Sequence, residues 1–434
     1  MTRAGGTRTT ITLIVLLALV ATACSHTLPF VRGPNEAPPP LAALDHRLIL
    51  IGDAGDADPN GERTLALLQQ RVRRDPTVTT IVFLGDNVYE TGMPEPTVLE
   101  GTATEAVLDE VLLTLFESRR DAERRLKAQV KAVRAPGARA IFIPGNHDWG
   151  QGKIGDGSKR VLEEQAYIDD MRRTVRDVDL AVLPRDACPG PVGVDLGRLG
   201  RLVVLDTQWW LESGAKPSPD QPGSCAEVTE QGVQAALERE VEGAVAAGRR
   251  PVVVGHHPLA SNGPHAGFVP LLEQVFPFKM AAAYVPFFVE WFPVPVIGSL
   301  MGYGRAYFSP SSQDFSGPGN ARFRAALIAS MEGAAARGAP TLAYASGHDH
   351  SLQVFRSEHG PRWSLVSGLG SRSKASGVSH DRATVFAHSS SDTPGFMEID
   401  FLANGAARLG VIEWSAAAER GVEVYSASLA TGKP

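Results

Sequence analysis

Six short apolar runs divide this chain, and each is followed at once by glycine or polar side chains. The runs are residues 47–53, 80–86, 139–146, 201–207, 251–257 and 341–348. Continuous apolar runs of this length are typical of strands that are buried on both faces of a sheet. Helical patterns alternate with them, at residues 63–74, 105–133, 159–175, 227–247 and 322–336. The alternation predicts an α/β fold, with further antiparallel strands between residues 362 and 428.

Five of these runs end in side chains that can bind metal ions. The side chains are Asp53, Asp86, Tyr89, Asn146, His147, His256, His257, His348 and His350. In open α/β sheets the C-terminal ends of the strands meet at one crevice, so ligands from distant loops come together there. Such oxygen and imidazole donors favour Fe, Zn or Mn over thiophilic metals. A carboxylate that bridges two cations, with several neutral ligands beside it, is typical of a binuclear hydrolytic site.

The order of these motifs resembles a known family. G-D-x-G, G-D-x-x-Y, G-N-H-D, V-x-x-H and G-H-x-H follow one another over about residues 47–370, as in the calcineurin-like metallophosphoesterases. Tyr89, three residues after Asp86, makes the sequence most similar to the purple acid phosphatase branch. The resemblance implies a four-layer α/β/β/α sandwich of two mixed β-sheets flanked by helices. Strand patterning alone would suggest a single doubly wound sheet instead.

The resemblance also assigns the metal ligands. The first metal, Fe(III) in purple acid phosphatases, would be held by Asp53, Tyr89 and His350. The second metal, a divalent Fe, Zn or Mn ion, would be held by Asn146, His256 and His348. Asp86 would bridge the two metal ions.

Further residues receive roles beside the metals. His147 would contact the substrate and assist protonation, offsetting charge on the phosphoryl group. His265, nine residues after His256, matches a substrate-binding or proton-donating position of the small purple acid phosphatases, with a plain loop histidine as the alternative. Asp148 would orient the His147 imidazole or cap its own turn. His257 would support the ligands from behind or simply pack.

The hypothesis is therefore phosphoester hydrolysis by an in-line attack of metal-bound hydroxide, since the metals lower the pKa of bound water to about 7. A phosphomonoesterase acting on a phosphorylated small molecule is favoured. The alternatives are a hydrolase of diesters, nucleotides or phospholipid head groups, and a non-catalytic metal-binding surface lipoprotein. A serine hydrolase is disfavoured because the sequence has no G-x-S-x-G motif.

The N-terminus has the pattern of an export signal. Positive residues precede the apolar run from Ile11 to Val20, which is too short to span a bilayer. The run leads into Ala-Thr-Ala-Cys, similar to a bacterial lipobox, so residues 1–23 would be removed and Cys24 lipidated. Ordinary cleavage near Ala23 is the alternative. We expect an exported protein, lipid-anchored to a bacterial membrane and facing the periplasm or the exterior.

The remaining organisation follows from composition. Residues 24–45 are Pro-rich and predict a flexible tether before a metallophosphoesterase domain at 46–430. Within it, residues 267–304 form an apolar insertion, either packed on the domain or exposed as a lid or membrane-facing collar. Outside the cytosol, Cys188 and Cys225 are more consistent with a disulfide than with free thiols. A net charge of −6 without a basic stripe gives no reason to expect nucleic-acid binding.

A Ser-rich loop follows the last predicted ligand. His380 and His388 in this loop are interpreted as solvated, and Arg372 and Lys374 as weak candidates for reaching a substrate phosphate. Asp56 is interpreted as a turn residue.

Overall fold

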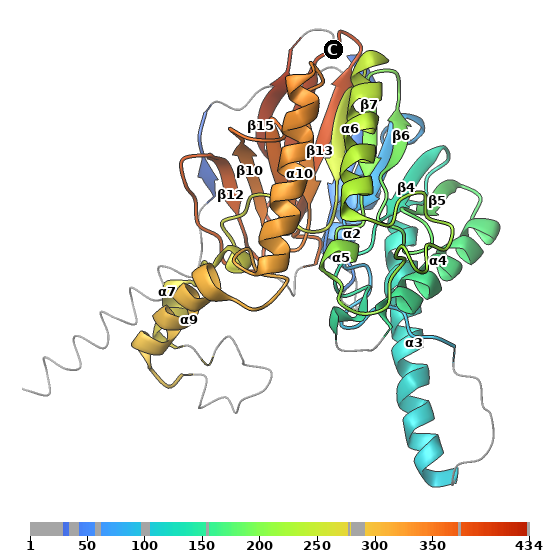
Figure 1. Cartoon of the computed structure of the whole chain (residues 1–434), viewed down its shortest axis with the longest axis vertical. Coiled ribbons are helices and arrows are strands. Elements are labelled where there is room, and N and C mark those ends of the chain that lie inside the picture. Colours follow the sequence, from blue (N-terminus) through green and yellow to red (C-terminus); the bar gives the residue numbers. More distant parts are fainter. Residues whose placement is uncertain are drawn as a thin grey trace, which may run out of the picture.

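The computed structural model describes residues 29–33, 43–56, 62–96, 105–152, 156–276, 278, 291–371 and 375–431. Two β-sheets pack face to face, and helices cover their outer faces (Figure 1). The predicted four-layer sandwich of two mixed sheets is therefore confirmed. The predicted signal segment 1–23, the lipidation site Cys24, and Arg372 and Lys374 lie outside the described residues.

One sheet has seven strands in the order β15-β14-β13-β2-β3-β4-β5. Its parallel half contains β2 (Leu44–Ile51), β3 (Thr79–Phe83), β4 (Ala138–Phe142) and β5 (Val178–Val182). Its antiparallel half contains β13 (Gly395–Leu402), β14 (Ala407–Ser415) and β15 (Arg420–Ala430). The strands β2, β3 and β4 are buried on both faces over most of their length, which explains their apolar sequence, whereas β5 at the sheet edge leaves Asp179 exposed.

The other sheet has eight strands in the order β1-β12-β10-β11-β9-β8-β7-β6. Parallel pairing joins β7 (Gly200–Val204), β8 (Arg250–Val254), β9 (Ala343–Ser346) and β11 (Trp363–Ser367). Antiparallel pairing adds β6 (Val192–Leu196), β10 (Leu352–Arg356), β12 (Thr384–His388) and β1 (Phe30–Val31).

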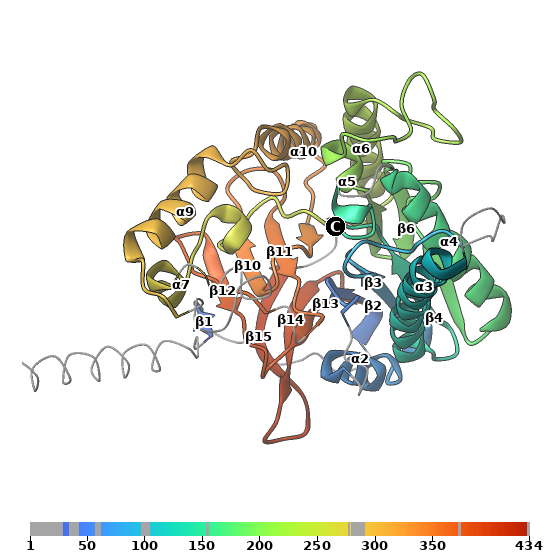
Figure 2. The same ribbon diagram turned by 90° about the horizontal axis from the view of Figure 1, so that it is seen from below.

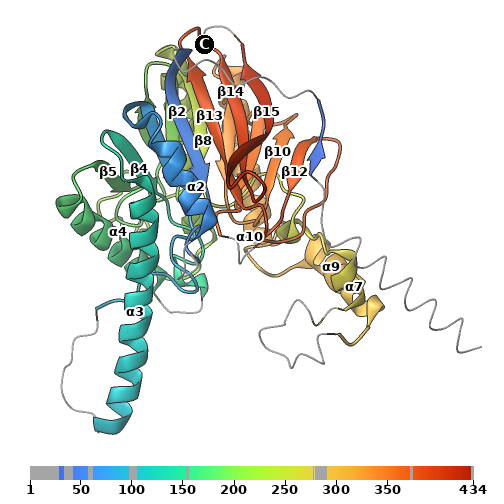
Figure 3. The ribbon, with the colours of Figure 1, turned by 180° about the vertical axis from the view of Figure 1, so that it is seen from behind.

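Helices cover both outer faces, as Figure 3 shows from behind. On the seven-stranded sheet lie α2 (Arg63–Val72), α3 (Glu105–Val133) and α4 (Gly157–Thr174). On the eight-stranded sheet lie α5 (Gln208–Leu211), α6 (Glu230–Ala246) and α10 (Pro318–Ala336). Short 3-10 turns are formed by Pro76–Val78, Gly150–Gly152 and Pro264–Ala266. Side chains such as Leu50, Val254 and Met397 fill the space between the sheets.

Two further helices, α7 (Leu271–Val275) and α9 (Pro295–Phe308), lie away from the sandwich on the side of β12 and β1 (Figure 2). They belong to the predicted apolar insertion. Within the part of the chain that the structure describes, no helix combines the length and apolar character needed to cross a membrane.

The structure corrects two local predictions. The stretch 24–45 is not wholly a tether, because Phe30 and Val31 pair with β12 and β2 begins at Leu44. His388 is not solvated: it is buried in β12, and its Nδ1 lies 2.6 Å from a Glu413 carboxylate oxygen. His380 is exposed, as predicted, and its ring stacks on the Phe30 ring with centroids 3.9 Å apart. The first error arises because a two-residue edge strand carries no periodic signal, and the second because Glu413, the partner of His388, lies in a later strand.

The loop regions hold a disulfide between Cys188 and Cys225. It joins the segment after β5 to the segment before α6, two loops that no strand pairing connects directly.

Candidate metal centre

The predicted ligands lie on loops that follow five parallel strands. Asp53 follows β2, Asp86 follows β3 and Asn146 follows β4, all in the seven-stranded sheet. His256 follows β8 and His348 follows β9 in the eight-stranded sheet. The C-terminal ends of strands from both sheets thus converge on one site, as expected for ligand binding in parallel sheets.

Glycines before the ligands allow these loops to approach closely. A Cβ added to Gly52 would lie 2.7 Å from Gly347 Cα, and one added to Gly145 would lie 2.3 Å from Asp86 Oδ1. Asp53, Asp86 and His348 also adopt positive φ angles of 59°, 56° and 70°. Such backbone strain is uncommon for non-glycine residues and collects at functional sites, where surrounding packing holds it.

One cluster of donors surrounds the hydroxyl of Tyr89. This oxygen lies 3.1 Å from Asp53 Oδ1, 3.0 Å from Asp86 Oδ2 and 3.2 Å from His350 Nε2. A single hydroxyl proton cannot serve two carboxylates and an imidazole at once. A cation held among these atoms would relieve the conflict, so this donor set fits a metal ion.

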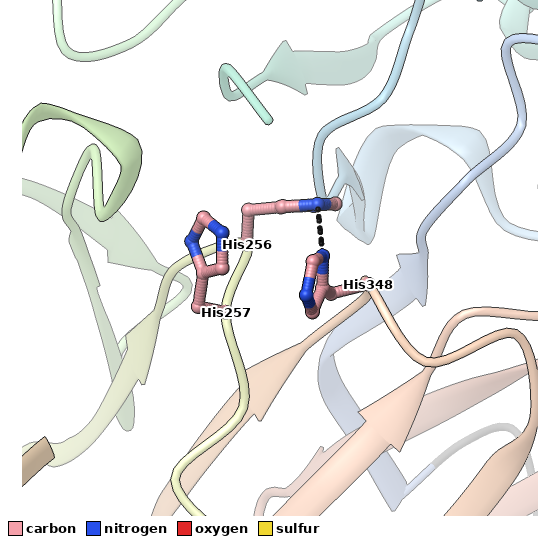
Figure 4. Close-up of side chains that lie close together, drawn as sticks. All are labelled: His256, His257 and His348. Carbon is pink, nitrogen blue, oxygen red and sulfur yellow. Dashed lines mark hydrogen bonds between the residues drawn. The ribbon is translucent and has the colours of Figure 1, made fainter. Parts of the chain in front are cut away.

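A second cluster joins Asn146, His256 and His348. The Asn146 Oδ1 atom lies 2.9 Å from His256 Nε2 and 3.0 Å from His348 Nδ1. Figure 4 shows the two imidazoles directed at each other, 3.2 Å apart between these nitrogens. The remaining nitrogens face backbone carbonyls, with His256 Nδ1 2.8 Å from the Leu84 oxygen and His348 Nε2 3.3 Å from the Gln313 oxygen.

This arrangement fixes the tautomers of the second cluster. A ring nitrogen that faces a carbonyl oxygen must carry the proton, so the opposite nitrogen presents a lone pair. Two lone pairs and an amide oxygen therefore converge without a proton between them. Histidines that bind metals are held by their outer nitrogens in this way.

Asp86 lies between the clusters. Its Oδ2 belongs to the cluster around Tyr89, while its Oδ1 lies 3.4 Å from His256 Nε2. The backbone N–H of His147 donates to the same Oδ1 at 2.9 Å, which fixes the carboxylate. Each oxygen thus faces one donor group, the arrangement that a bridging carboxylate needs.

The electrostatics suit cation binding. Burial raises the pKa of Asp86, but nearby His256 and His147 outweigh it and the net pKa is lowered to about 2. Burial and the neighbouring imidazole of His265 lower the pKa of His348 well below its usual value. Burial and the Asp86 carboxylate raise the pKa of Tyr89 in the protein alone. The site therefore presents an ionised carboxylate at Asp86 and a neutral imidazole at His348, whereas for His256 burial is outweighed by the charge of Asp86, which raises the pKa.

His147 lies beside the Tyr89 ring, with ring centroids 4.1 Å apart. Its Nδ1 lies 2.6 Å from the Glu90 carbonyl oxygen, so this nitrogen carries the proton and donates. The predicted orientation of His147 by Asp148 is wrong, because Glu90 holds the ring instead. Gln151, which the sequence prediction missed, contacts the same ring, with its amide nitrogen 2.5 Å from Nε2 and 3.0 Å from Nδ1.

Asp148 joins two ligand-bearing loops. Its carboxylate accepts backbone hydrogen bonds from Gly145 at 2.8 Å, Val88 at 2.9 Å and Asn87 at 3.2 Å. Burial and then the charge of Asp86 raise its pKa to about 7. Asp148 thus joins the loop after β3 to the loop after β4. Its hydrogen bond from the Gly145 N–H also caps its own turn.

His265 stacks on His348, with centroids 4.0 Å apart. Its Nδ1 lies 2.9 Å from Asp314 Oδ1, and Arg305 Nε donates to that same oxygen at 2.7 Å. Burial raises the pKa of Asp314, but the bond from His265 and the charge of Arg305 outweigh it and lower the net pKa. The carboxylate therefore fixes the imidazole and connects it to α9.

His257 is fully buried behind the second cluster. Its Nδ1 lies 2.9 Å from Thr207 Oγ1 and its Nε2 lies 2.7 Å from Gln313 Oε1, so both nitrogens are engaged. Its ring also contacts His348 at 4.5 Å between centroids (Figure 4). It supports the ligand from behind, the first of the two predicted alternatives.

A pocket of about 270 Å³ opens onto the two clusters. Its lining comprises Asp86, Asn146, His147, Gln151, His265, Ser311, Gln313, His348 and His350. Ser311, Gln313 and Asp314 come from a loop between α9 and α10 that sequence analysis did not assign to the site. Nothing in the local sequence distinguishes them from ordinary loop residues. Asp56 takes an ion pair to Arg125 at 2.6 Å and lies outside this lining.

The geometry defines a class of protein that binds two metal ions for hydrolysis at a shared carboxylate. Residues 46–281 match the calcineurin-like phosphoesterases, over more than half of the chain. The chain belongs to this family and is a metal-dependent phosphoesterase. His348 and His350 lie beyond the matched residues, so it is the structure that brings them to the site.

No curated protein sequence matches this chain. Among solved structures, the fold is similar to GAP50, "the anchor in the inner membrane complex of Plasmodium", at 14% identity and a TM-score of 0.50. That similarity covers 89% of this chain and 88% of the other, and it shows the fold alone. A dimetal phosphatase from Danio rerio matches at 12% identity and a TM-score of 0.40, covering 89% and 99% of the two chains.

Proposed function

We propose that the chain is a phosphomonoesterase of the purple acid phosphatase type, with Fe(III) in the Tyr89 cluster and divalent Fe, Zn or Mn beside His348. The observation that carries this proposal is the hydroxyl of Tyr89 within 3.2 Å of two carboxylates and an imidazole. A phenolate is a hard anionic donor, which suits trivalent iron. When bound, the two metals would neutralise phosphoryl charge and acidify a water for attack.

Two imidazoles would handle the protons and charge of the substrate. Both rings line the pocket: His147 donates from Nδ1 to the Glu90 carbonyl and has Gln151 beside its Nε2, while the Nδ1 of His265 faces Asp314 and Arg305. A protonated Nε2 can donate to a phosphoryl oxygen or to the leaving group. General acid catalysis of this kind contributes about 10²–10⁴-fold to rates.

The size of the pocket favours monoesters. About 270 Å³ accommodates a phosphate group with little beyond its first substituent. The second candidate is a hydrolase of phospholipid head groups or other diesters. An adjacent groove of about 670 Å³ favours it, because Phe268, Val269 and Phe308 offer an apolar surface beside His265.

We further propose that the protein is exported and anchored to a bacterial membrane through lipidated Cys24. The lipobox-like sequence before Cys24 motivates this location. The Cys188–Cys225 disulfide supports it, since such bonds persist in oxidising compartments. Replacing Cys24 with Ser should move the protein from the membrane fraction to the soluble fraction; unchanged fractionation would refute the lipid anchor.

Iron can be tested by spectroscopy and metal analysis. Protein loaded with iron should show a visible tyrosinate-to-Fe(III) absorption that Tyr89→Phe removes. Tyr167→Phe is the matched control, because Tyr167 lies on α4 away from the ligands and should leave the absorption intact. A colourless, fully active Zn or Mn enzyme would defeat the iron assignment and leave the phosphoesterase intact.

Substrate class needs a separate assay. Purified protein should hydrolyse p-nitrophenyl phosphate faster than bis(p-nitrophenyl) phosphate, with nucleotides and phospholipids assayed in parallel. Faster turnover of diesters or phospholipids would replace the monoesterase proposal with the second candidate.

A further inference from the structure

The segment 291–308, which contains α9, exposes apolar side chains to an unusual degree. Of the nine large apolar side chains exposed in the described residues, six lie here: Trp291, Phe292, Leu300, Tyr303, Tyr307 and Phe308. Leu300 and Tyr307 are each 64% exposed and Phe308 is 73% exposed. We refer to residues 267–276 and 291–308 as the α7–α9 arm. Over residues 291–308 the insertion is thus exposed, whereas Val269 in the same arm is buried.

The arm is ordered around aromatic contacts and carries little charge. The rings of Tyr303 and Tyr307 lie 4.7 Å apart, and those of Phe276 and Trp291 lie 5.6 Å apart. Arg305 is the only charged residue of α9, and its guanidinium turns inward to Asp314. An uncharged apolar patch of this kind marks a surface that contacts a protein or a membrane.

The N-terminal end of the described chain lies on the same side. Phe30 in β1 stacks on His380. The loop that carries His380 also carries Gly377, and a Cβ added to Gly377 would lie 2.5 Å from Pro270 and 3.1 Å from Phe268, which both belong to the arm. Figure 2 shows β1 and β12 on the same side of the sandwich as α7 and α9. The chain therefore enters the domain next to the arm.

The length of the chain before β1 limits where an anchored protein can sit. Five residues separate Cys24 from Phe30, so six Cα–Cα steps join them. At about 3.5 Å per extended residue they span at most about 20 Å. Under the proposed lipid anchor, the bilayer surface must lie within this distance of β1, and the arm is the apolar surface beside it.

We propose that the α7–α9 arm docks on the surface of a lipid bilayer. Its Trp and Tyr side chains combine an apolar ring with a polar group, the chemistry enriched at membrane interfaces. His265 binds α9 through Asp314 and Arg305, so docking would hold the active-site pocket close to the membrane. The tether argument rests on the proposed anchor, whereas the exposed surface does not depend on it.

Vesicle binding without the anchor tests the surface itself. The full chain carrying Cys24→Ser is mixed with phosphatidylcholine vesicles and sedimented. A triple variant, Phe292→Ser with Leu300→Ser and Tyr307→Ser, should lower the bound fraction at least tenfold. Leu162→Ser is the matched control, since Leu162 is 40% exposed on α4, and it should bind as the parent does. Retained hydrolysis of p-nitrophenyl phosphate shows that each variant is folded.

Tryptophan quenching locates the contact. Of the six tryptophans, only Trp291 is exposed, so brominated lipids should quench fluorescence in the parent and far less in Trp291→Phe. Unquenched Trp291 in vesicle-bound protein would overturn the proposal, as would equal binding by the triple variant and the parent. If the parent does not bind vesicles and is a dimer, while the triple variant is a monomer, the surface contacts a second copy of the chain and the membrane proposal is wrong.

Discussion

Replacing Asp148 with Ala should destabilise the protein strongly, because this carboxylate is the shared acceptor of two ligand loops. Three buried backbone N–H groups, from Gly145, Asn87 and Val88, lose their acceptor in the variant. A buried donor left without a partner costs about 1–3 kcal/mol. Three of them sum to about 3–9 kcal/mol, and water entering the vacated space reduces the loss. We expect the free energy of unfolding to fall by about 3–5 kcal/mol.

Urea unfolding followed by circular dichroism at pH 7.5, with EDTA present, measures this loss without metal ions. Asp156→Ala is the control: Asp156 caps α4 through the Lys159 N–H at 3.4 Å, and its removal should cost about 1 kcal/mol. The reasoning would be refuted by an Asp148→Ala variant within about 1 kcal/mol of the parent. Metal affinity of the same variant should fall about 10–100-fold, since Asp148 positions the loops of Asp86 and Asn146.

The other predictions concern pH, the disulfide and turnover. Burial and the charge of Arg139 lower the pKa of His46 to about 4. As the pH falls, the imidazole of His46 is therefore protonated in the unfolded chain before it is protonated in the folded protein. The free energy of unfolding that is present above about pH 6.5 is lost toward pH 4, and the loss between pH 7 and 5 is about 2 kcal/mol. His46→Gln should remove that part of the pH dependence in urea titrations, and an unchanged dependence would contradict the assignment. Replacing Cys188 and Cys225 with Ser should lower the free energy of unfolding by up to about 4 kcal/mol, because the disulfide closes a loop with a sequence separation of 37. Equal stability of variant and parent would show that the cross-link does not restrict the unfolded chain. His147→Ala should lower turnover of p-nitrophenyl phosphate about 10²-fold or more with metal content retained, and equal turnover would remove it from the chemistry.

The sequence predicted the parts of the site that lie at strand ends. Two signals combine at these positions, an apolar run and the glycine and polar residue that end it. The five predicted apolar runs concerned all form parallel strands of the two sheets, and they end in Asp53, Asp86, Asn146, His256 and His348. The motif order also implied the two-sheet sandwich, which strand patterning alone did not. The glycines explain why the signal is reliable, because close approach of the loops tolerates no side chain there.

The parts that escaped prediction depend on contacts distant in sequence. Gln313 and Asp314 join the site only because α9 and α10 bring their loop over His257 and His265. Of the two roles predicted for Asp148, capping its own turn is found at Gly145 and orienting His147 is not, and the fold adds backbone partners about sixty residues earlier. Such partners have no periodic or local signature. His388 was misassigned for the same reason, because Glu413 lies in a later strand.

Both donor clusters draw on both sheets, and this couples metal binding to folding. The first takes Asp53 and Tyr89 from the seven-stranded sheet and His350 from the eight-stranded sheet. The second takes Asn146 from the former, and His256 and His348 from the latter. A cation in either cluster therefore cross-links the two sheets, and separating the sheets must release it. Binding to the folded state alone stabilises by RT ln(1 + [L]/Kd), about 2.7 kcal/mol at a hundredfold excess over Kd. The same linkage explains the need for Asp148 and the glycines: without metal, converging lone pairs and carboxylates at the sheet interface repel one another, and rigid loops must hold them in place.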